Sequence, residues 1–531
     1  MLNPIVVKEP RVNVSGDTDL NHIVYTGGKR TSTQVYVSES YQLNSAPVNA
    51  SWSITPPSNK VIVDRFFKVR YYFECTATGG DFSLYLHDAP RQFPGASITD
   101  VVSLSINGET VSENVQRKLH AMLCYGNTKE DRNKSWSLAP SKPDAFQQYS
   151  DFTAVNGGSN RNPLGGYGED SSEQNRSVSY EVLSSTKVRF IVTEPLFISP
   201  LYQGIGHQQE GMVNVNELML NLRFSSDNSR VWSHSTGGNA ITAVSSVFYR
   251  APELLINYIT PLDDMKLPEI QLLPYQKCHE YVKTLDDIAV GGSLEAYSDT
   301  IRLASIPKYI YLFARRRDDQ NSFLTSDSFP SIEKINVQWD NQNGLLSSAT
   351  PQDLFEISRR NGYNQSWLAF KKYRGSVLCL EMGKDIGLEP NQSIGLRGSF
   401  NIQIDITFKN QSSSIFKGEM MMVVCNTGVF QLGNNSASVS IGNLDESTIV
   451  QARKNAPEVH HSNIDLEGGS FWSGLKNIVN KVAHFASPIV SAVAPEFSPL
   501  VEGVKSLTGS GLSGGRMSGG RMSGGMVRRI K

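Results

Sequence analysis

Hydrophobic and polar residues alternate along short stretches of this chain, and residues that favour turns separate the stretches. The alternation is strictest at 215–224 and 400–408, where apolar residues occupy nearly every second position. Successive side chains of a β-strand point to opposite faces, so this period gives one buried face and one solvated face. Both stretches are therefore predicted to be half-buried β-strands.

Further strands are predicted where β-branched and aromatic residues gather, because these side chains suit a pleated and partly buried surface. The predicted strands lie at 61–73, 101–106, 186–192, 243–249, 301–313, 332–339, 376–382 and 419–424. We expect the strand at 243–249 to close the first structural unit, before Pro252. Gly, Asn, Ser and Asp crowd residues 125–180, which predicts a large excursion from the core.

The same order of elements occurs twice. The strand at 101–106 enters the turn dipeptide Asn107-Gly108 and is followed by a helix-like stretch at 112–123. The strand at 332–339 enters Asn343-Gly344, and a short helix is predicted from Pro351 to Arg359 with Thr350 as its N-cap. Two successive units of about 190 residues with one internal order indicate two β sandwiches. The alternative is a single irregular β protein.

Length, composition and cysteine usage agree with a multidomain β protein that folds in a reducing compartment. With 531 residues, two or three domains are expected, and 39% hydrophobic with 19% charged residues argues against disorder over most of the chain. The net charge of −1 gives the body no long-range attraction for nucleic acid. The five cysteines are dispersed and form no C-x-x-C motif, and the sequence starts without a secretion signal, so reduced, buried thiols are expected.

A family resemblance rests on three features of these residues: the stretch from Pro56-Pro57-Ser58 to Tyr72, the paired strand, Asn-Gly and helix segments, and the strand at 301–313. Together they resemble double jelly-roll major capsid proteins. That group includes adenovirus hexons and the coat proteins of polinton-like and adintovirus-like elements and of tailless membrane-containing phages. The resemblance covers residues 45–435 and is one of pattern.

The resemblance implies an all-β chain of two tandem eight-stranded jelly rolls, with short helices in the loops and a C-terminal amphipathic helix outside the family pattern. It implies a homotrimer that forms a pseudo-hexagonal capsomer in the shell of an icosahedral DNA virus. Neighbouring capsomers and minor capsid proteins would be partners, with the virion as destination, after synthesis in the host cytoplasm with or without nuclear import. The expected parts are an N-terminal arm (1–44), a first jelly roll (45–251), a second jelly roll (252–435), a linker (436–469), an amphipathic helical segment (470–507) and a Gly/Arg-rich basic tail (508–531).

The segment after the linker is predicted to be an amphipathic helix. Its apolar residues recur at intervals of three and four and share one face: Phe471, Trp472, Leu475, Ile478, Val482 and Phe485. Such a face suits a membrane surface, here an internal viral membrane, or a partner protein. The alternative is a helix docked on its own capsomer.

The last residues form a cationic string, since no acidic residue follows Glu502. Its basic residues include Arg516, Arg521, Arg528, Arg529 and Lys531. In a virion these residues are expected to contact genome phosphates through non-specific charge. A nuclear-import signal or a solvated tail is the alternative.

No catalytic, cofactor or metal site is predicted from the sequence. Cys278-His279-Glu280 is compact, but adjacent strand residues point to opposite faces and no second ligand pair is spaced for a metal. The run 315–319, Arg-Arg-Arg-Asp-Asp, is read as a surface turn or as an ion-pair cluster between subunits. Two other functions share a β-rich fold: a carbohydrate-binding or adhesion protein of two sandwiches, and a polysaccharide hydrolase with paired carboxylates.

Overall fold

The computed structural model of the chain divides it into two units, Met1–Glu446 and Ser447–Lys531, and both sandwiches lie in the first. The structure describes residues 6–7, 22–23, 30–58, 60–84, 87–125, 180–201, 211–234, 240–261, 267–433, 435–442, 444–447 and 449. The predicted excursion at 125–180 falls almost entirely outside these residues. So does the chain after residue 449.

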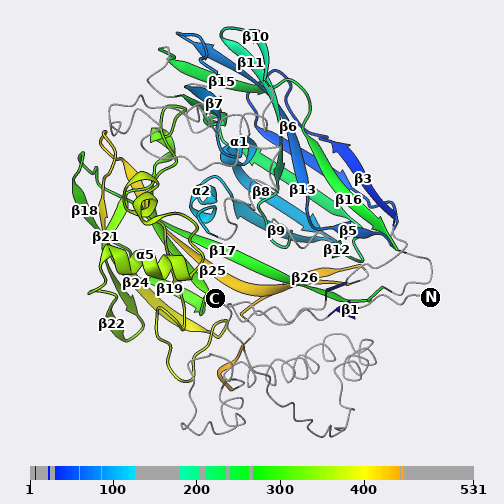
Figure 1. Ribbon diagram of the computed structural model, residues 1–531. Helices are drawn as coiled ribbons and strands as arrows, with labels where there is room; N and C mark the ends of the chain where they lie inside the picture. The colour runs from blue at the N-terminus through cyan, green and yellow to red at the C-terminus, as the bar shows by residue number, and fades with distance from the viewer. Residues whose placement is uncertain are drawn as a thin grey trace, which may run out of the picture. The chain divides into compact units, whose positions relative to one another are not determined.

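The first sandwich consists of a large sheet and a smaller sheet that face each other (Figure 1). The large sheet contains β3 (Arg30–Val37), β5 (Ile62–Asp64), β6 (Lys68–Thr78), β10 (Tyr180–Ser184), β11 (Lys187–Pro195), β12 (Gly211–Met212), β15 (Ala243–Phe248) and β16 (Glu253–Thr260). The smaller sheet has the order β4-β13-β8-β9, with β4 (Asn49–Ile54), β13 (Leu218–Phe224), β8 (Thr99–Ile106) and β9 (Glu109–Asn114). Short elements complete this part of the chain: β1 (Val6–Val7), β2 (His22–Ile23), β7 (Asp88–Pro90), α1 (Pro94–Ile98), α2 (Leu119–Met122), the 3-10 turn η4 (Ser229–Val231) and β14 (Trp232–His234).

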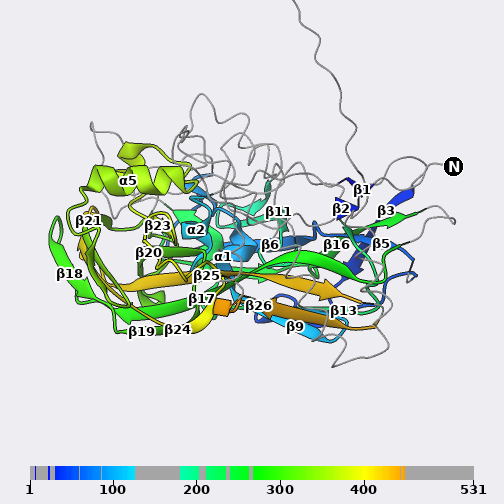
Figure 2. The same ribbon diagram turned by 90° about the horizontal axis from the view of Figure 1, so that it is seen from below.

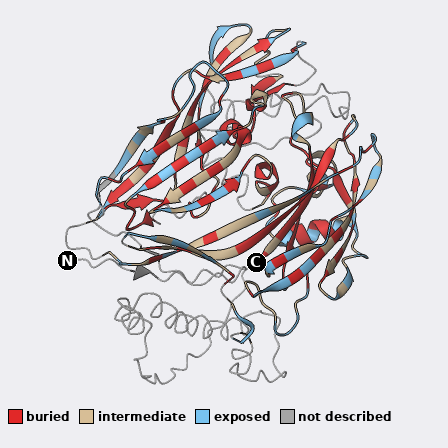
Figure 3. Ribbon diagram, turned by 180° about the vertical axis from the view of Figure 1, so that it is seen from behind, coloured by how far each residue is buried: buried red, intermediate tan, exposed pale blue. Residues whose placement is uncertain are grey.

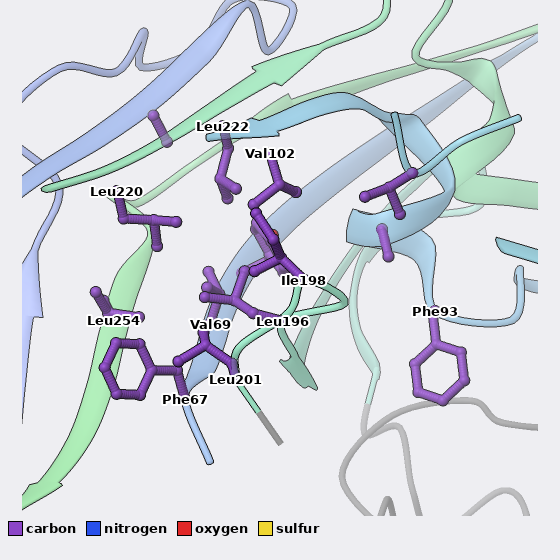
Figure 4. Close-up of a cluster of buried hydrophobic side chains, with 14 of the residues drawn as sticks. Phe67, Val69, Phe93, Val102, Leu196, Ile198, Leu201, Leu220, Leu222 and Leu254 are labelled. Carbon is purple, nitrogen blue, oxygen red and sulfur yellow. The ribbon is translucent and has the colours of Figure 1, made fainter. Parts of the chain in front are cut away.

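Alternating burial in β13 explains how the two sheets enclose a core. Every second residue of β13 is buried, as the sequence predicts, and bands of buried and exposed residues follow one another along its neighbours (Figure 3). Leu220 lies opposite Leu104 of β8 and Trp52 of β4. Figure 4 shows Leu220 and Leu222 beside Val69 of β6 and the other side chains that fill the space between the sheets.

The second sandwich has five strands in each of its two sheets among the described residues. One sheet contains β17 (Gln271–Thr284), β25 (Gly418–Leu432), β20 (Tyr309–Arg316), β23 (Leu378–Glu381) and β26 (Ala437–Ile441). The other contains β18 (Ser293–Tyr297), β19 (Ile301–Ser305), β24 (Arg397–Lys409), β21 (Ser331–Trp339) and β22 (Gln342–Leu345). Three short helical elements lie between these strands: η5 (Asp318–Gln320), α5 (Pro351–Arg360) and the π-helical turn η6 (Ala369–Tyr373).

The tandem β architecture is confirmed, and so is the helix predicted after the second Asn-Gly turn. Thr350 caps α5: its hydroxyl accepts the Asp353 backbone N–H at 3.3 Å, and its own N–H donates to the Asp353 carboxylate at 2.8 Å. This reciprocal pair satisfies two donors that the first helical turn leaves unpaired. The corresponding prediction at 112–123 is only partly right, because Ser112 pairs with Ser103 in the β8–β9 ladder and only Leu119–Met122 is helical.

Three expected boundaries need correction. The strand β16 lies beyond the expected end of the first jelly roll at 251, yet it pairs with β3, β5 and β6 of the first sandwich. The chain therefore passes to the second sandwich between β16 and β17. The expected arm 1–44 contributes β3 as an edge strand, and the expected linker 436–469 contributes β26, which pairs with β25.

Two predicted strands are each divided in two. The stretch 61–73 breaks between β5 and β6, and 301–313 breaks between β19 and β20, next to Pro307. Proline cannot donate to a ladder, and at this point the chain leaves the β24 sheet for the β25 sheet. Such breaks help to explain why each sandwich contains more than the eight strands expected.

Two glycines with the same backbone conformation provide a test of this packing. Gly375 and Gly108 have φ of +84° and +85°, but a Cβ on Gly375 would lie 1.7 Å from the Phe329 carbonyl oxygen, whereas one on Gly108 would meet nothing within 4 Å. We expect Gly108→Ala to lower the unfolding free energy by about 1 kcal/mol through left-handed strain alone. Gly375→Ala should lower it by about 3 kcal/mol or more, since the backbone must also move. Urea unfolding of both variants measures the difference, and equal losses would contradict the close packing at Gly375.

Candidate functional site at the junction of the two sandwiches

The two sandwiches share the strands β17 and β25, which run past both (Figure 2). Leu273 of β17 and Phe430 of β25 are buried in the core of the first sandwich. Met421 and Val423, further back along β25, belong to a second cluster of buried side chains. One antiparallel ladder therefore contributes side chains to two cores.

A buried carboxylate from the second sandwich forms ion pairs with two arginines from the first. Asp327 accepts a hydrogen bond from Arg91 Nη1 at 2.8 Å and another from Arg230. Arg91 also donates to the Ser322 and Thr325 carbonyl oxygens, at 3.1 and 3.0 Å. Burial alone would raise the pKa of Asp327, but the charges of Arg230 and Arg91 outweigh it and hold this pKa well below its usual range.

His120 of α2 completes this group as a neutral side chain. Burial lowers the pKa of His120 to about 3, with Arg374 and Arg230 acting in the same direction against Asp327. Ser97 Oγ donates to the Gln92 carbonyl oxygen at 2.7 Å, so it must accept from His120 Nε2 at 3.2 Å. This assigns the ring proton to Nε2, which also faces Asp327 at 3.3 Å.

Further hydrogen bonds cross the junction, one donated from each sandwich. Arg374 of the second sandwich donates to the His120 carbonyl oxygen at 2.9 Å, and its guanidinium lies 5.4 Å from the centre of the Phe329 ring. Tyr125 donates its hydroxyl proton to the Val377 carbonyl oxygen at 2.6 Å. Each sandwich therefore inserts charged or polar side chains into the other.

A second ionic group lies where α2 meets β17. Lys118 forms ion pairs with Glu113 of β9 and, at 3.0 Å, with Glu280 of β17. Burial would lower the pKa of Lys118, but Glu113, Cys278 and Glu280 together raise it, so this amine remains charged. The lysine thus links a carboxylate of each sandwich.

These two groups can orient the sandwiches but show no catalytic arrangement. A buried ion pair repays its desolvation only in one geometry, so it contributes more to a unique arrangement than to net stability. Within the described ranges, no three His, Cys, Asp or Glu residues are grouped so as to hold a metal ion. The same ranges contain no helix long and apolar enough to cross a membrane.

The candidate contact residues named from the sequence cannot be placed in this junction. All of the apolar candidates from Phe471 to Phe485 and all of the basic candidates from Arg516 to Lys531 lie outside the described residues. The run 315–319 is described and is not simply a surface turn. Arg315 is buried and pairs with Glu419 and Asp318, so these ion pairs lie within one chain.

Sequence reasoning missed the Asp327 group because its members are distant in the chain and share no motif. Arg91, His120, Arg230 and Asp327 come from four separate loops or short helical elements. Charged residues in loops are ordinarily solvated, so nothing local distinguishes these four.

Replacing Asp327 by Asn keeps the side chain's shape and removes its charge. We expect the unfolding free energy to fall by about 3–5 kcal/mol, because two guanidinium groups lose a buried charged partner. Urea unfolding at pH 7 measures this loss. Asp299→Asn is the control, since it removes the exposed Lys283–Asp299 pair of 2.9 Å and should change stability by less than about 1 kcal/mol. Similar losses in the two variants would show that the Asp327 charge is not needed.

The neutral state of His120 predicts acid sensitivity with a defined sign. A group whose pKa falls on folding, here from 6.5 to about 3, contributes stability above pH 6.5 that is lost as the pH falls toward 3. His120→Gln cannot titrate, so between pH 7 and 5 the wild-type chain should lose about 2 kcal/mol more than this variant. Unfolding free energies at both pH values give the comparison. Parallel pH profiles would mean that the pKa of His120 does not change on folding, which would contradict a buried neutral side chain.

Two protein-family models match the chain, one in each sandwich. The model described as Sputnik virophage major capsid protein 1st domain matches residues 2–184. The model described as Major capsid protein V20 C-terminal domain matches residues 279–428. A curated relative, the putative capsid protein V20 of Sputnik virophage, is 28% identical over 533 residues, which cover 92% of this chain and 88% of the relative.

Two solved structures have a similar fold. A chain in the cryo-EM structure of the Sputnik virophage matches with a TM-score of 0.72 at 27% identity, over 90% of this chain and 98% of that chain. The mavirus major capsid protein matches with a TM-score of 0.65 at 14% identity, over 84% and 97%, a likeness of fold alone. These relatives favour a structural role over carbohydrate binding, adhesion or polysaccharide hydrolysis. With two sandwiches in tandem and capsid relatives along nearly its whole length, the chain is a double jelly-roll major capsid protein of an icosahedral virus.

Proposed function

We propose that three copies of this chain form a pseudo-hexagonal capsomer that tiles the shell of a DNA virus. The observation that supports this is the junction, where a shared ladder and buried ion pairs join two sandwiches within each chain. Three rigid pairs of sandwiches present six similar sides, so identical trimers can meet neighbouring capsomers with little change of shape. Minor capsid proteins are the other proposed partners, and the chain would be made in the host cytoplasm before it enters the virion.

The outer face of the first sandwich offers a surface for such lateral contacts. Val35 and Val37 of the edge strand β3 are about half exposed, and Ile191 of β11 is exposed on the same sheet. The partly exposed Arg70 lies on the same sheet and pairs at 3.1 Å with the buried Glu253, which is opposite Val37 in the ladder. Apolar residues within a polar surround are typical of interfaces between soluble subunits.

The trimer is tested by the size and outline of the purified chain. Multi-angle light scattering should give about 176 kDa, three times 58.6 kDa, and negative-stain images should show particles with a hexagonal outline. A species of 58.6 kDa at micromolar concentration would contradict the proposal. A dimer would contradict it equally, because two chains cannot generate six similar sides.

We also propose two separate contacts for the C-terminal region. Its basic residues would contact genome phosphates, and the apolar face that begins at Phe471 would contact an internal membrane surface or a partner protein. The sequence pattern supports both contacts, and they differ in their dependence on salt. Charge contacts weaken steeply as salt rises, whereas apolar burial does not.

Two full-length variants separate these contacts. Replacing Arg516, Arg521, Arg528, Arg529 and Lys531 by Ala should weaken binding to a DNA duplex by about tenfold or more at low salt and flatten its salt dependence. Phe471→Ser with Trp472→Ser should instead weaken flotation with vesicles that contain anionic lipid, while DNA binding is kept. DNA binding is measured by fluorescence anisotropy. Loss of neither property, or of both in both variants, would contradict separate contacts.

A further inference from the structure

Two cysteines face each other in the ladder that joins the sandwiches. Cys278 of β17 lies directly opposite Cys425 of β25, and their sulfur atoms are 2.7 Å apart. Both are free thiols in the structure. A disulfide bond is about 2.0 Å long, so the sulfurs need to approach by only about 0.7 Å.

We propose that Cys278 and Cys425 form an intrachain disulfide when the assembled protein leaves a reducing cell for an oxidising medium. The oxidant belongs to the class of small disulfides, such as glutathione disulfide. Reducing conditions keep thiols free inside cells, whereas extracellular particles meet oxidants. The cross-link is therefore a modification of the mature particle rather than a requirement for folding.

The reaction proceeds by two exchanges between thiol and disulfide. Half-buried Cys278 loses its proton to solvent, attacks the oxidant and releases one glutathione thiolate. The sulfur of Cys425 then attacks the mixed disulfide, and its proton passes to the second glutathione as that group leaves. Two protein thiols and one glutathione disulfide thus give one protein disulfide and two glutathione molecules. Cys425 is fully buried, which accounts for Cys278 reacting first.

Sheet geometry excludes the nearest competing partner in the same sheet. Cys379 belongs to β23, and β20 lies between β23 and β25. Two strand spacings amount to about 9–10 Å, beyond the Cα separation that a disulfide can bridge. Cys75 is buried in the core of the first sandwich, and Cys124 donates to the His120 carbonyl oxygen at 3.4 Å.

Cys278 and Cys425 lie between the parts of β17 and β25 that enter the two cores, so a cross-link there should stabilise the fold. Leu273 and Tyr275, before Cys278 on β17, are buried in the first core, and Met421 and Val423, before Cys425 on β25, belong to the second cluster. The backbone N–H of Cys278 also donates to Glu113 of the first sandwich at 3.3 Å. A bond here closes a loop between residues 147 positions apart, and long loops lose the most unfolded-state entropy on closure.

The test uses the full-length chain, purified as its native assembly and split into dithiothreitol-treated and glutathione disulfide-treated samples. After denaturation and alkylation, the oxidised chain should have three alkylated cysteines instead of five. Peptide mapping without reduction should link the peptide with Cys278 to the peptide with Cys425. The melting temperature should rise on the order of 5 °C on oxidation and return after reduction.

Two variants serve as controls. Cys278→Ser should keep all four of its thiols and show no rise in melting temperature, whereas Cys75→Ser should still lose two thiols and show the rise. Peptide mapping of the wild-type chain decides the matter even where a variant folds poorly. Five alkylated cysteines after oxidation, a lasting glutathione adduct on Cys278, or a link between two chains would each overturn the proposal. None of these outcomes bears on the role of the chain in the capsid.

Discussion

The ladder between β17 and β25 determines how the rest of the chain is arranged. Strands of 14 and 15 residues are long for a sandwich, and their two ends are buried in different cores. Neither core is complete without the other sandwich, because Leu273 and Phe430 are buried in the first cluster and Ala121 and Cys124 in the second. A duplicated domain would otherwise leave two bodies joined by a flexible connection.

Buried ion pairs constrain the relative orientation of the two sandwiches at this apolar junction. Apolar surfaces can slide against each other at small cost. An ion pair such as Asp327 with Arg91, or Lys118 with Glu280, is favourable only in one relative orientation of the two sandwiches. A shell needs that precision, since a small angular error in each subunit accumulates over many copies. We therefore interpret these groups as determinants of geometry rather than as sources of stability.

Features with a local physical cause were predictable from the sequence. The alternation in β13 and β24 reports half-burial directly, and Thr350 with Asp353 is a helix start readable from side-chain chemistry. Cys278, His279 and Glu280 were treated as strand residues, but the full extent of β17 was not predicted, since its burial does not alternate regularly and Pro274 lies within it. Its burial depends on which core each end enters, and that is a long-range property. The Asp327 group was not predicted for the same reason, because its residues come together only when the two sandwiches pack against each other.

Glu194 and His120 are buried groups of the first sandwich, and acid changes their contributions to stability in opposite directions. This affects the particle in mildly acidic surroundings. Burial raises the pKa of Glu194 to about 7 even though the Gly95 and Ala96 backbone N–H groups each donate to this carboxyl at 2.8 Å. The Glu194 contribution to stability grows as the pH falls from 7 to 4.5, while that of His120 shrinks below 6.5. In the interval from 4.5 to 6.5 the two changes offset each other in part. The stability of each subunit, and of a shell made of such subunits, should therefore change less across this interval than either Glu194 or His120 alone would make it change.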